Sequence, residues 1–421
     1  MHREIVMRRT LFIAAMLITV NLLYIIAILT TFKNSLWAEF EMPLVEADGE
    51  VDILIDSRSL LDIIEELADR VWEAYGKHLK TKPYDPGFYA WSIQYEIRAL
   101  LNLYLLTRKR IWLERALLRI DILVNYSDVN GDDIPSWGNY NETYGSPRYK
   151  YYEWSVWDGL ISFSILRACS IILGDEELKN NSTLCTKANS YLNLVKKVIN
   201  SWHKCWSWVS REPEVGYYWT VKRADVHGPV MNQFSALGLA ELLLYEITGD
   251  PKYLSRPIAM ARYLKRSLSL MQRLKAYTWT YSAHGNIEDI SHEAIEVRFM
   301  TMCYERGIVF NKSDMLFLAN TYKRLIWRGE FEYPKLNTYV GGGLAQDYSP
   351  NARGWTLLSR YSPLVWFYQT LNYHDIVKRK GISTACFLLG LTELLLYKQS
   401  SKNLAKDALN ECEERLELLI L

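Results

Sequence analysis

From residue 57 onward, apolar residues recur every three or four positions, which is the period of a helix buried on one face. In 57–77 they fall at Leu60, Leu61, Ile63, Ile64, Leu67, Val71 and Trp72. The same period predicts about twelve helices in all. The others cover 88–107, 110–124, 155–173, 183–202, 230–247, 251–270, 290–306, 313–326, 357–371, 382–397 and 402–419.

The links between these helices alternate between short and long. Short links, such as 249–251 and 307–312, join two helices into a hairpin, whereas long links at 127–153, 205–228, 273–289 and 328–362 join successive hairpins. This alternation favours an all-α fold of six hairpins closed into a ring, an (α/α)6 toroid over residues 57–421. An open helical solenoid is the alternative.

The first 56 residues have a different composition. Residues 10–32 form an apolar segment long enough to cross a bilayer, which needs roughly 20 residues, and Arg3, Arg8 and Arg9 precede it. The positive-inside rule then predicts a cytoplasmic stub (1–9), a transmembrane signal anchor (10–32), a linker (33–56) and a main domain outside the membrane. A cleaved signal peptide is the alternative, although its apolar core is usually shorter.

Composition adds three expectations about partners and location. The formal net charge of +1, without a basic run, argues against a nucleic-acid partner. Sequons are typical of a glycoprotein and occur at Asn125, Asn141, Asn180, Asn181 and Asn311. Oxidation outside the cell would allow disulfides between Cys386 and Cys412 and between Cys169 and Cys185, which lie at matching distances from hairpin turns.

Aromatic residues gather in the long links rather than in the apolar runs. The chain holds 15 Trp and 29 Tyr, and in a toroid the long links all open on one face. Flat sugar rings pack on aromatic rings, while Tyr and Trp polar tips bond hydroxyl groups. A glycan-binding face is therefore expected, with plugging of loops onto the ring as the alternative reading. Candidate substrate-binding residues near these links are Trp157, Asn232, Gln233, Trp279, Arg353, Trp355 and Arg360.

The stretch 279–300 carries the densest set of proton-exchanging groups. Asp289 or Ser291 can cap the helix that begins there, and His292 and Glu296 share one face of it. Plain capping with a helical side-chain pair is the alternative to a functional cleft. The candidate catalytic residues are Tyr281, His284, Glu288, Asp289 and His292, together with Asp158 at another helix start.

The segment HGPVMNQFSALGLAELLLYEITGDPKYL, residues 227–254, resembles the hairpin unit of (α/α)6-toroid carbohydrate enzymes. Uronic-acid epimerases, polysaccharide lyases and six-hairpin glycosidases show such units, in which an inner helix runs into a Thr-Gly-Asp turn. NQF and YEITGD also resemble glucuronyl C5-epimerases, whose tyrosine-rich catalytic pattern is not matched at 366–374. The resemblance implies an architecture and a carbohydrate substrate, and no catalytic residue is carried over.

Two chemistries fit the candidate residues. Uronate lysis or C5-epimerisation needs a base, for which Tyr281, His284 or His292 is available, and a cation such as Arg353 or Arg360 to hold the carboxylate. Glycoside hydrolysis needs two carboxyl groups, for which Asp158, Glu288 and Asp289 are available. A non-catalytic glycan-binding or envelope protein is a third reading.

A calcium loop is a further candidate. Asp128, Asn130 and Asp132 supply oxygen ligands at alternate positions, but Asp133 stands where a glycine is expected. An acidic Asn-Gly turn explains the same residues. No cofactor is expected to be required for catalysis.

Overall fold

The computed structural model describes residues 45–47, 50–52, 57–140, 151–210, 212–222, 229–282, 289–328, 334–343, 349–380 and 384–398. The chain divides into two units. The smaller unit includes residues 1–63 and holds an antiparallel hairpin of β1 (Val45–Ala47) and β2 (Glu50–Asp52). The larger unit spans 64–329 and 334–399 and contains the features below. The predicted anchor, 10–32, lies outside the described residues.

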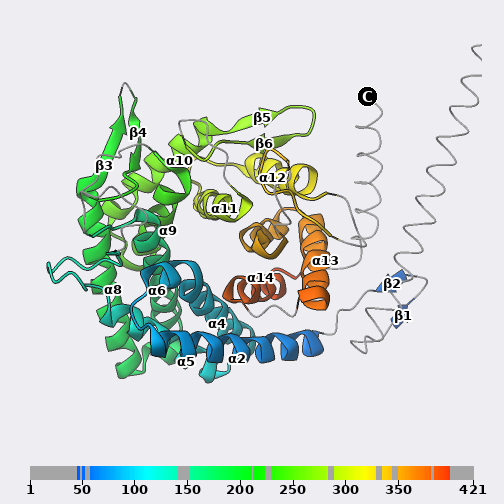
Figure 1. Ribbon diagram of the computed structural model, residues 1–421. Helices are drawn as coiled ribbons and strands as arrows, with labels where there is room; N and C mark the ends of the chain where they lie inside the picture. Colours follow the sequence, from blue (N-terminus) through cyan, green and yellow to red (C-terminus); the bar gives the residue numbers. More distant parts are fainter. Residues whose placement is uncertain are drawn as a thin grey trace, which may run out of the picture. The chain divides into compact units, whose positions relative to one another are not determined.

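Six elements of the larger unit form an inner ring (Figure 1). They are α4 (Gln94–Thr107), α6 (Ser155–Gly174), α9 (Met231–Thr248), α11 (Ile290–Glu305), η6 (Ser349–Arg360) and α14 (Ala385–Leu396). Each contacts the next in this order, and α14 contacts α4, which closes the ring. The predicted (α/α)6 toroid is confirmed, and the open solenoid is excluded because a solenoid does not bring its first and last helices together.

A second layer of helices surrounds the ring (Figure 1). It consists of α5 (Arg110–Asn125), α8 (Ser182–Trp202), α10 (Ser255–Ser267), α12 (Lys312–Thr321) with the π-helical η5 (Tyr322–Ile326), and α13 (Pro363–Lys380). Each packs on the inner element that precedes it in the chain. The long α2 (Ser57–Thr81) reaches the start of α14, where the Tyr75 hydroxyl accepts a hydrogen bond of 3.0 Å from the Ala385 amide. The last predicted helix, 402–419, lies outside the described residues.

The helices of the two layers differ in how much of their surface is buried. The inner helix α9 is buried without interruption from Met231 to Leu244, as expected of a helix that is apolar on every face. The outer helix α8 buries only one stripe, which runs from Ala188 to Trp202. Among the described helices, α6 alone is long and apolar enough to cross a membrane, and 78% of its most apolar window is buried inside the protein.

One close contact between two helices depends on a glycine. A Cβ atom on Gly159 of α6 would lie 2.4 Å from the backbone carbonyl carbon of Ala236 in α9. No real Cβ atom approaches a backbone atom that closely, so glycine lets these two inner helices touch along their backbones.

Short elements complete the larger unit. They are α3 (Pro86–Phe88), the π-helical η1 (Tyr89–Ile93), α7 (Glu176–Lys179), η3 (His203–Cys205), η4 (Pro251–Tyr253), and the antiparallel hairpins β3 (Trp206–Val209) with β4 (Glu212–Tyr218) and β5 (Ser269–Met271) with β6 (Ala276–Thr278).

Two sequence-based expectations are wrong. The predicted helix 357–371 is broken at Ser362, so that 349–360 forms the 3₁₀ element η6 and α13 begins at Pro363. Proline lacks an amide proton and suits the first position of a helix rather than its interior, which explains the break. The Cys169 and Cys185 thiols are free, and Cys169 Sγ lies 3.4 Å from the Ala188 carbonyl oxygen. The Cys386 thiol is free as well, with Sγ 3.9 Å from the Trp91 carbonyl oxygen, so the predicted bridge to Cys412, which itself lies outside the described residues, is not formed either.

Candidate functional site

The starts of the inner elements meet at one end of the ring. Isolated β-bridges join the loops that precede neighbouring inner helices: Trp154 with Val221, Val230 with Ser282, and Asp289 with Tyr339. Each of the first five inner elements is followed by a described outer helix that returns the chain, so the inner elements run in one direction. We call this end of the ring the mouth.

A carboxylate–imidazole pair lies at the mouth. Asp289 caps α11, since its Oδ1 accepts hydrogen bonds from the Ser291 amide (2.8 Å) and the His292 amide (3.3 Å). Its other oxygen, Oδ2, lies 2.8 Å from His292 Nδ1. The contact places the proton of a neutral imidazole on Nδ1 and leaves a lone pair on Nε2. A histidine held in this way is suited to accept a proton from a ligand.

Electrostatics keep the carboxylate of Asp289 ionised. Burial alone would raise its pKa, but the hydrogen bond and charge of His292, with hydrogen bonds from Ser291, hold that pKa well below its ordinary value. An ionised Asp289 stabilises a positive charge on His292 after proton uptake. The pair therefore resembles a general base with an orienting carboxylate.

Aromatic rings flank the imidazole. The His292 ring lies edge-on to Trp91, with centroids 5.3 Å apart, and 6.4 Å from the centroid of Tyr281. Trp91 belongs to the π-helical turn η1 directly before α4, and such turns are frequent at functional sites. The His292 side chain is 31% exposed, so the imidazole is only partly buried between these rings.

Below the mouth lies a small cavity of about 20 Å³ inside the ring. Its lining includes side chains from all six inner elements: Tyr95, Arg98, Leu160, Leu239, Ser291, Ala294, Ile295, Arg298, Arg353, Gly354 and Leu389. Ser291 lines the cavity and precedes His292 in the chain, whereas His292 and Asp289 themselves are not among the lining residues. The described lining contains three arginines and no acidic residue.

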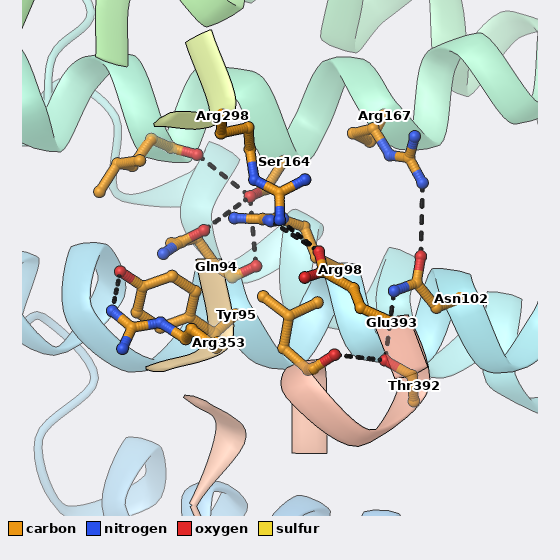
Figure 2. A network of polar contacts seen from close by, with 12 residues as sticks. Gln94, Tyr95, Arg98, Asn102, Ser164, Arg167, Arg298, Arg353, Thr392 and Glu393 are labelled. Carbon is orange, nitrogen blue, oxygen red and sulfur yellow. Dashed lines mark hydrogen bonds and ion pairs between the residues drawn. The ribbon is translucent and has the colours of Figure 1, made fainter. Parts of the chain in front are cut away.

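Arg353 is the arginine with spare hydrogen-bonding capacity. Its side chain is buried, with the residue 5% exposed, and its Cζ lies 4.0 Å from the centroid of the Tyr95 ring. Nη2 donates to the Tyr95 hydroxyl, whereas Nη1 is buried and has no hydrogen-bond partner (Figure 2). An unsatisfied buried guanidinium donor is costly, and an anion in the cavity would satisfy it.

The position of Arg353 depends on its neighbour. A Cβ atom on Gly354 would lie 2.3 Å from the Cβ of Ala294 in α11. Glycine thus allows η6 to lie directly against α11, and this brings Arg353 to the wall of the cavity.

Arg98 and Arg298 share one carboxylate (Figure 2). Arg98 Nη2 lies 3.3 Å from Oε1 of Glu393, and Arg298 Nη2 bonds the same oxygen. Burial and the nearby charge of Arg298 lower the pKa of Arg98 to about 9, so it remains protonated at neutral pH. Two buried cations with one buried anion leave excess positive charge beside the cavity.

Further polar contacts cross the ring below these arginines. Arg167 Nη2 donates to Oδ1 of Asn102 at 3.4 Å, and Asn102 Nδ2 donates to the Thr392 hydroxyl at 3.2 Å (Figure 2). These contacts join α6, α4 and α14. We call this set of residues the floor.

Several predicted site residues have structural roles instead. Asp158 is fully buried and accepts hydrogen bonds from the Trp137 amide (2.9 Å) and Trp202 Nε1 (2.7 Å), so it fixes a loop and an outer helix to α6. Gln233 Oε1 accepts from the Val156 amide at 3.1 Å. Asn232 is fully buried, and its side-chain amide has no hydrogen-bond partner in the structure.

The tryptophans and the second arginine also lie away from the cavity. Trp279 donates to Glu296 and stacks on Trp355, which donates to the Ile290 carbonyl. Trp157 is buried beside Trp154. Arg360 ends η6 and pairs with Glu305, so the expectation that it holds a substrate is wrong. Its place at the opposite end of η6 from the mouth explains the difference.

Three other predictions concern residues that the structure describes in part or not at all. His284 and Glu288 lie outside the described residues. Asp132 Oδ1 accepts a hydrogen bond from the Ile134 amide, while Oδ1 of Asp128 and of Asn130 are buried without partners. Calcium binding there stays a prediction.

Sequence reasoning missed Trp91, Tyr95, Arg98, Arg298 and Glu393. The sequence did contain a signal for Glu393. Glu393 is the single charged residue in the apolar helix ACFLLGLTELLL, and a charge on an all-apolar helix requires a buried partner. The partners themselves come from distant parts of the chain.

No family model and no curated protein matches this sequence. Solved structures resemble the fold. The α-1,6-mannanase of Salegentibacter sp. HEL1_6 has 11% identity and a TM-score of 0.48 over 80% of this chain and 100% of its own. An inactive variant of it, in complex with α-1,6-mannotetrose, has 16% identity and a TM-score of 0.42 over 72% of this chain and 75% of its own. A D-mannose isomerase has 11% identity and a TM-score of 0.46 over 72% and 87% of the two chains. These similarities concern the fold and carry no conclusion about substrate or reaction.

Proposed function

We propose that this protein is an enzyme of acidic carbohydrates that transfers a proton next to a carboxylate. The observation that carries the proposal is the position of the Asp289–His292 pair at the mouth of a cavity lined by three arginines. A base and an anion holder are what lysis and epimerisation of uronates share in their first step; in the proposal His292 at the mouth is the base and Arg353 in the cavity wall is the anion holder.

The chemistry assigns a role to each group. His292 Nε2 takes the proton from the carbon next to the substrate carboxylate, and the electron pair of the broken C–H bond moves onto the carboxylate oxygens. Arg353 stabilises the negative charge that develops there. Return of a proton from the opposite face gives an epimer, whereas loss of the oxygen substituent from the next carbon gives an unsaturated product.

Glycoside hydrolysis is the second candidate. It requires one carboxylic acid that is protonated at working pH and a second carboxylate. The low pKa of Asp289 argues against its use as the acid, and Glu393 is already bound to two arginines. Carboxylates outside the described residues, such as Glu288, keep hydrolysis as an outcome for the assay.

The site would face outward if the predicted anchor forms. We propose, from the apolar segment 10–32 and the arginines before it, a single-pass protein with its main domain outside the membrane. Mass spectrometry of the mature N-terminus tests this, because cleavage near residue 39 would contradict an anchor.

The function is tested with the full chain in detergent and a panel of acidic and neutral polysaccharides and oligosaccharides. Unsaturated products identify a lyase, deuterium uptake without cleavage identifies an epimerase, and new reducing ends without unsaturation identify a hydrolase. We expect His292→Ala to abolish turnover and Arg360→Gln to retain it. Binding without any product would support the non-catalytic reading and overturn the proposal.

A further inference from the structure

The cavity inside the ring has room for one small particle. Its volume is about 20 Å³, and a cavity needs about 10–15 Å³ to hold a single water molecule. A sugar residue or a tetrahedral oxyanion such as sulfate is too large for this space, whereas a chloride ion is only slightly larger than water. Size therefore restricts the occupant to a water molecule or a monoatomic ion.

The charges around the cavity favour an anion over water. Arg98, Arg298 and Arg353 line it, and no acidic residue does so among those that the structure describes. Glu393 bonds Arg98 and Arg298 through one oxygen but is not itself a lining residue (Figure 2). Arg167, in the floor, adds a fourth cation whose hydrogen bond goes to a neutral amide. In the described part of the chain, these four guanidinium groups have one carboxylate among their bonded partners.

Arg353 has no carboxylate partner among the described residues. Its side chain is buried, and Nη1 has no hydrogen-bond partner. The ionisable groups that act most strongly on its charge are Cys386, Tyr95 and Tyr373, and a thiol and two phenols are uncharged at neutral pH. A buried charge without a counter-charge is costly. Water would satisfy only the N–H group of Nη1, whereas an anion also neutralises the charge.

The remaining walls of the cavity suit a halide. Leu160, Leu239, Ile295 and Leu389 place apolar side chains around it, so an ion that enters exchanges its hydration shell for few polar contacts. The cost of removing that shell opposes burial of any ion, and it is smaller for chloride and bromide than for fluoride, which binds water more strongly.

We propose that this cavity is a binding site for one halide ion, which is chloride under ordinary conditions. Nη1 of Arg353 donates to the ion, and Arg98 and Arg298 supply the positive potential around it. The ion balances the charge at the point where η6 contacts α4, and so it stabilises the closed ring. The proposal goes beyond the proposed function and does not depend on it, because the ion stabilises the protein without any substrate.

Thermal unfolding of the full chain in detergent tests the site. Chloride is compared at equal ionic strength with methanesulfonate, an anion of the same charge that is too large for the cavity. We expect the unfolding midpoint to rise by about 2 °C for each tenfold rise in chloride above its dissociation constant, because the ion binds the folded state alone. Bromide should act in the same way. Equal midpoints in chloride and methanesulfonate would overturn the proposal.

Matched variants locate the ion. Arg353→Gln should lose the dependence on chloride, whereas Arg360→Gln, on the same element but paired with Glu305 outside the cavity, should keep it. A dependence that persists in Arg353→Gln would place the ion elsewhere and overturn the proposal. Anomalous diffraction from wild-type crystals grown in bromide decides the matter even if Arg353→Gln does not fold: a peak beside Nη1 supports the site, and a cavity without one overturns it. None of these measurements uses a substrate, so their failure leaves the proposed function standing.

Discussion

Arg353 stacks on the ring of Tyr95, a residue 258 positions earlier in the chain, and also donates a hydrogen bond to its hydroxyl group. This contact joins η6 to α4 across the cavity and fixes the direction of the guanidinium. The Tyr95 ring holds the plane of Arg353 through a cation–π contact, and the hydroxyl occupies Nη2, so that Nη1 is the donor left for a ligand.

Tyr95→Phe tests the hydrogen bond between the Tyr95 hydroxyl and Arg353. The ring stays, while the acceptor for Nη2 is lost, so we expect Arg353 to reorient and catalytic efficiency to fall about tenfold, the equivalent of one lost hydrogen bond to a charged group. Kinetics on the acidic substrate measure the effect, and thermal unfolding controls for stability. An unchanged kcat/KM would show that the hydroxyl does not position Arg353.

Asp289→Asn should lower stability in a pH-dependent way. The folded pKa of Asp289 is depressed, so its contribution is fully present above the ordinary carboxyl pKa of about 4 and is lost as the pH falls towards the folded value. We expect a loss of about 1 kcal/mol at neutral pH, because asparagine can still cap the helix but lacks the negative charge that favours the helix N-terminus and the contact with His292. Urea unfolding of both proteins at several pH values should show the difference shrinking in acid, and a constant difference would contradict it.

Glu393→Gln should destabilise the ring strongly. It removes the single carboxylate shared by Arg98 and Arg298, and leaving a buried charge without its partner costs about 3–5 kcal/mol. Glu305→Gln is the control, because its pair with Arg360 is about one-third exposed and worth at most about 1 kcal/mol. Chemical denaturation measures both, and equal effects would argue against a buried pair.

Replacement of two glycines of α6 by alanine should change the stability of the protein in different ways. Gly159→Ala places a methyl group against the backbone of α9, so we expect a loss of about 1–3 kcal/mol from overpacking. A Cβ on Gly174 meets nothing within 4 Å, so Gly174→Ala should be neutral or stabilising by up to about 1 kcal/mol. Thermal unfolding compares them, and a stable Gly159→Ala protein would show that the two helices can separate.

Local patterns were sufficient to predict most of the fold. Helical periodicity located the inner and outer helices, and the alternation of link lengths indicated their closure into a ring. The failure at 357–371 has a local cause, because Pro363 suits the start of a helix and divides one apolar run between the 3₁₀ element η6 and α13.

The same reasoning predicted fewer of the contacts in the candidate site. Asp289 and His292 are three residues apart, so their pairing follows from a helix start. Arg98 and Glu393 are 295 residues apart, and their contact depends on the closure of the ring. Polar residues at helix starts were expected to face the cleft. The carboxylate of Asp158 instead accepts a hydrogen bond from the amide of Trp137, in a loop that folds back over the helix start.

Gly354 affects the shape of the cavity through its lack of a side chain and not through charge. The backbone of η6 rests on Ala294 because position 354 has no side chain, and one added methyl group would push η6, and Arg353 with it, away from α11. A displacement of about 1 Å at a reacting centre can cost about a hundredfold in rate. The position of the Arg353 guanidinium is thus set by the residue beside it that has no side chain, so the charge in the cavity wall can be moved without replacing any arginine.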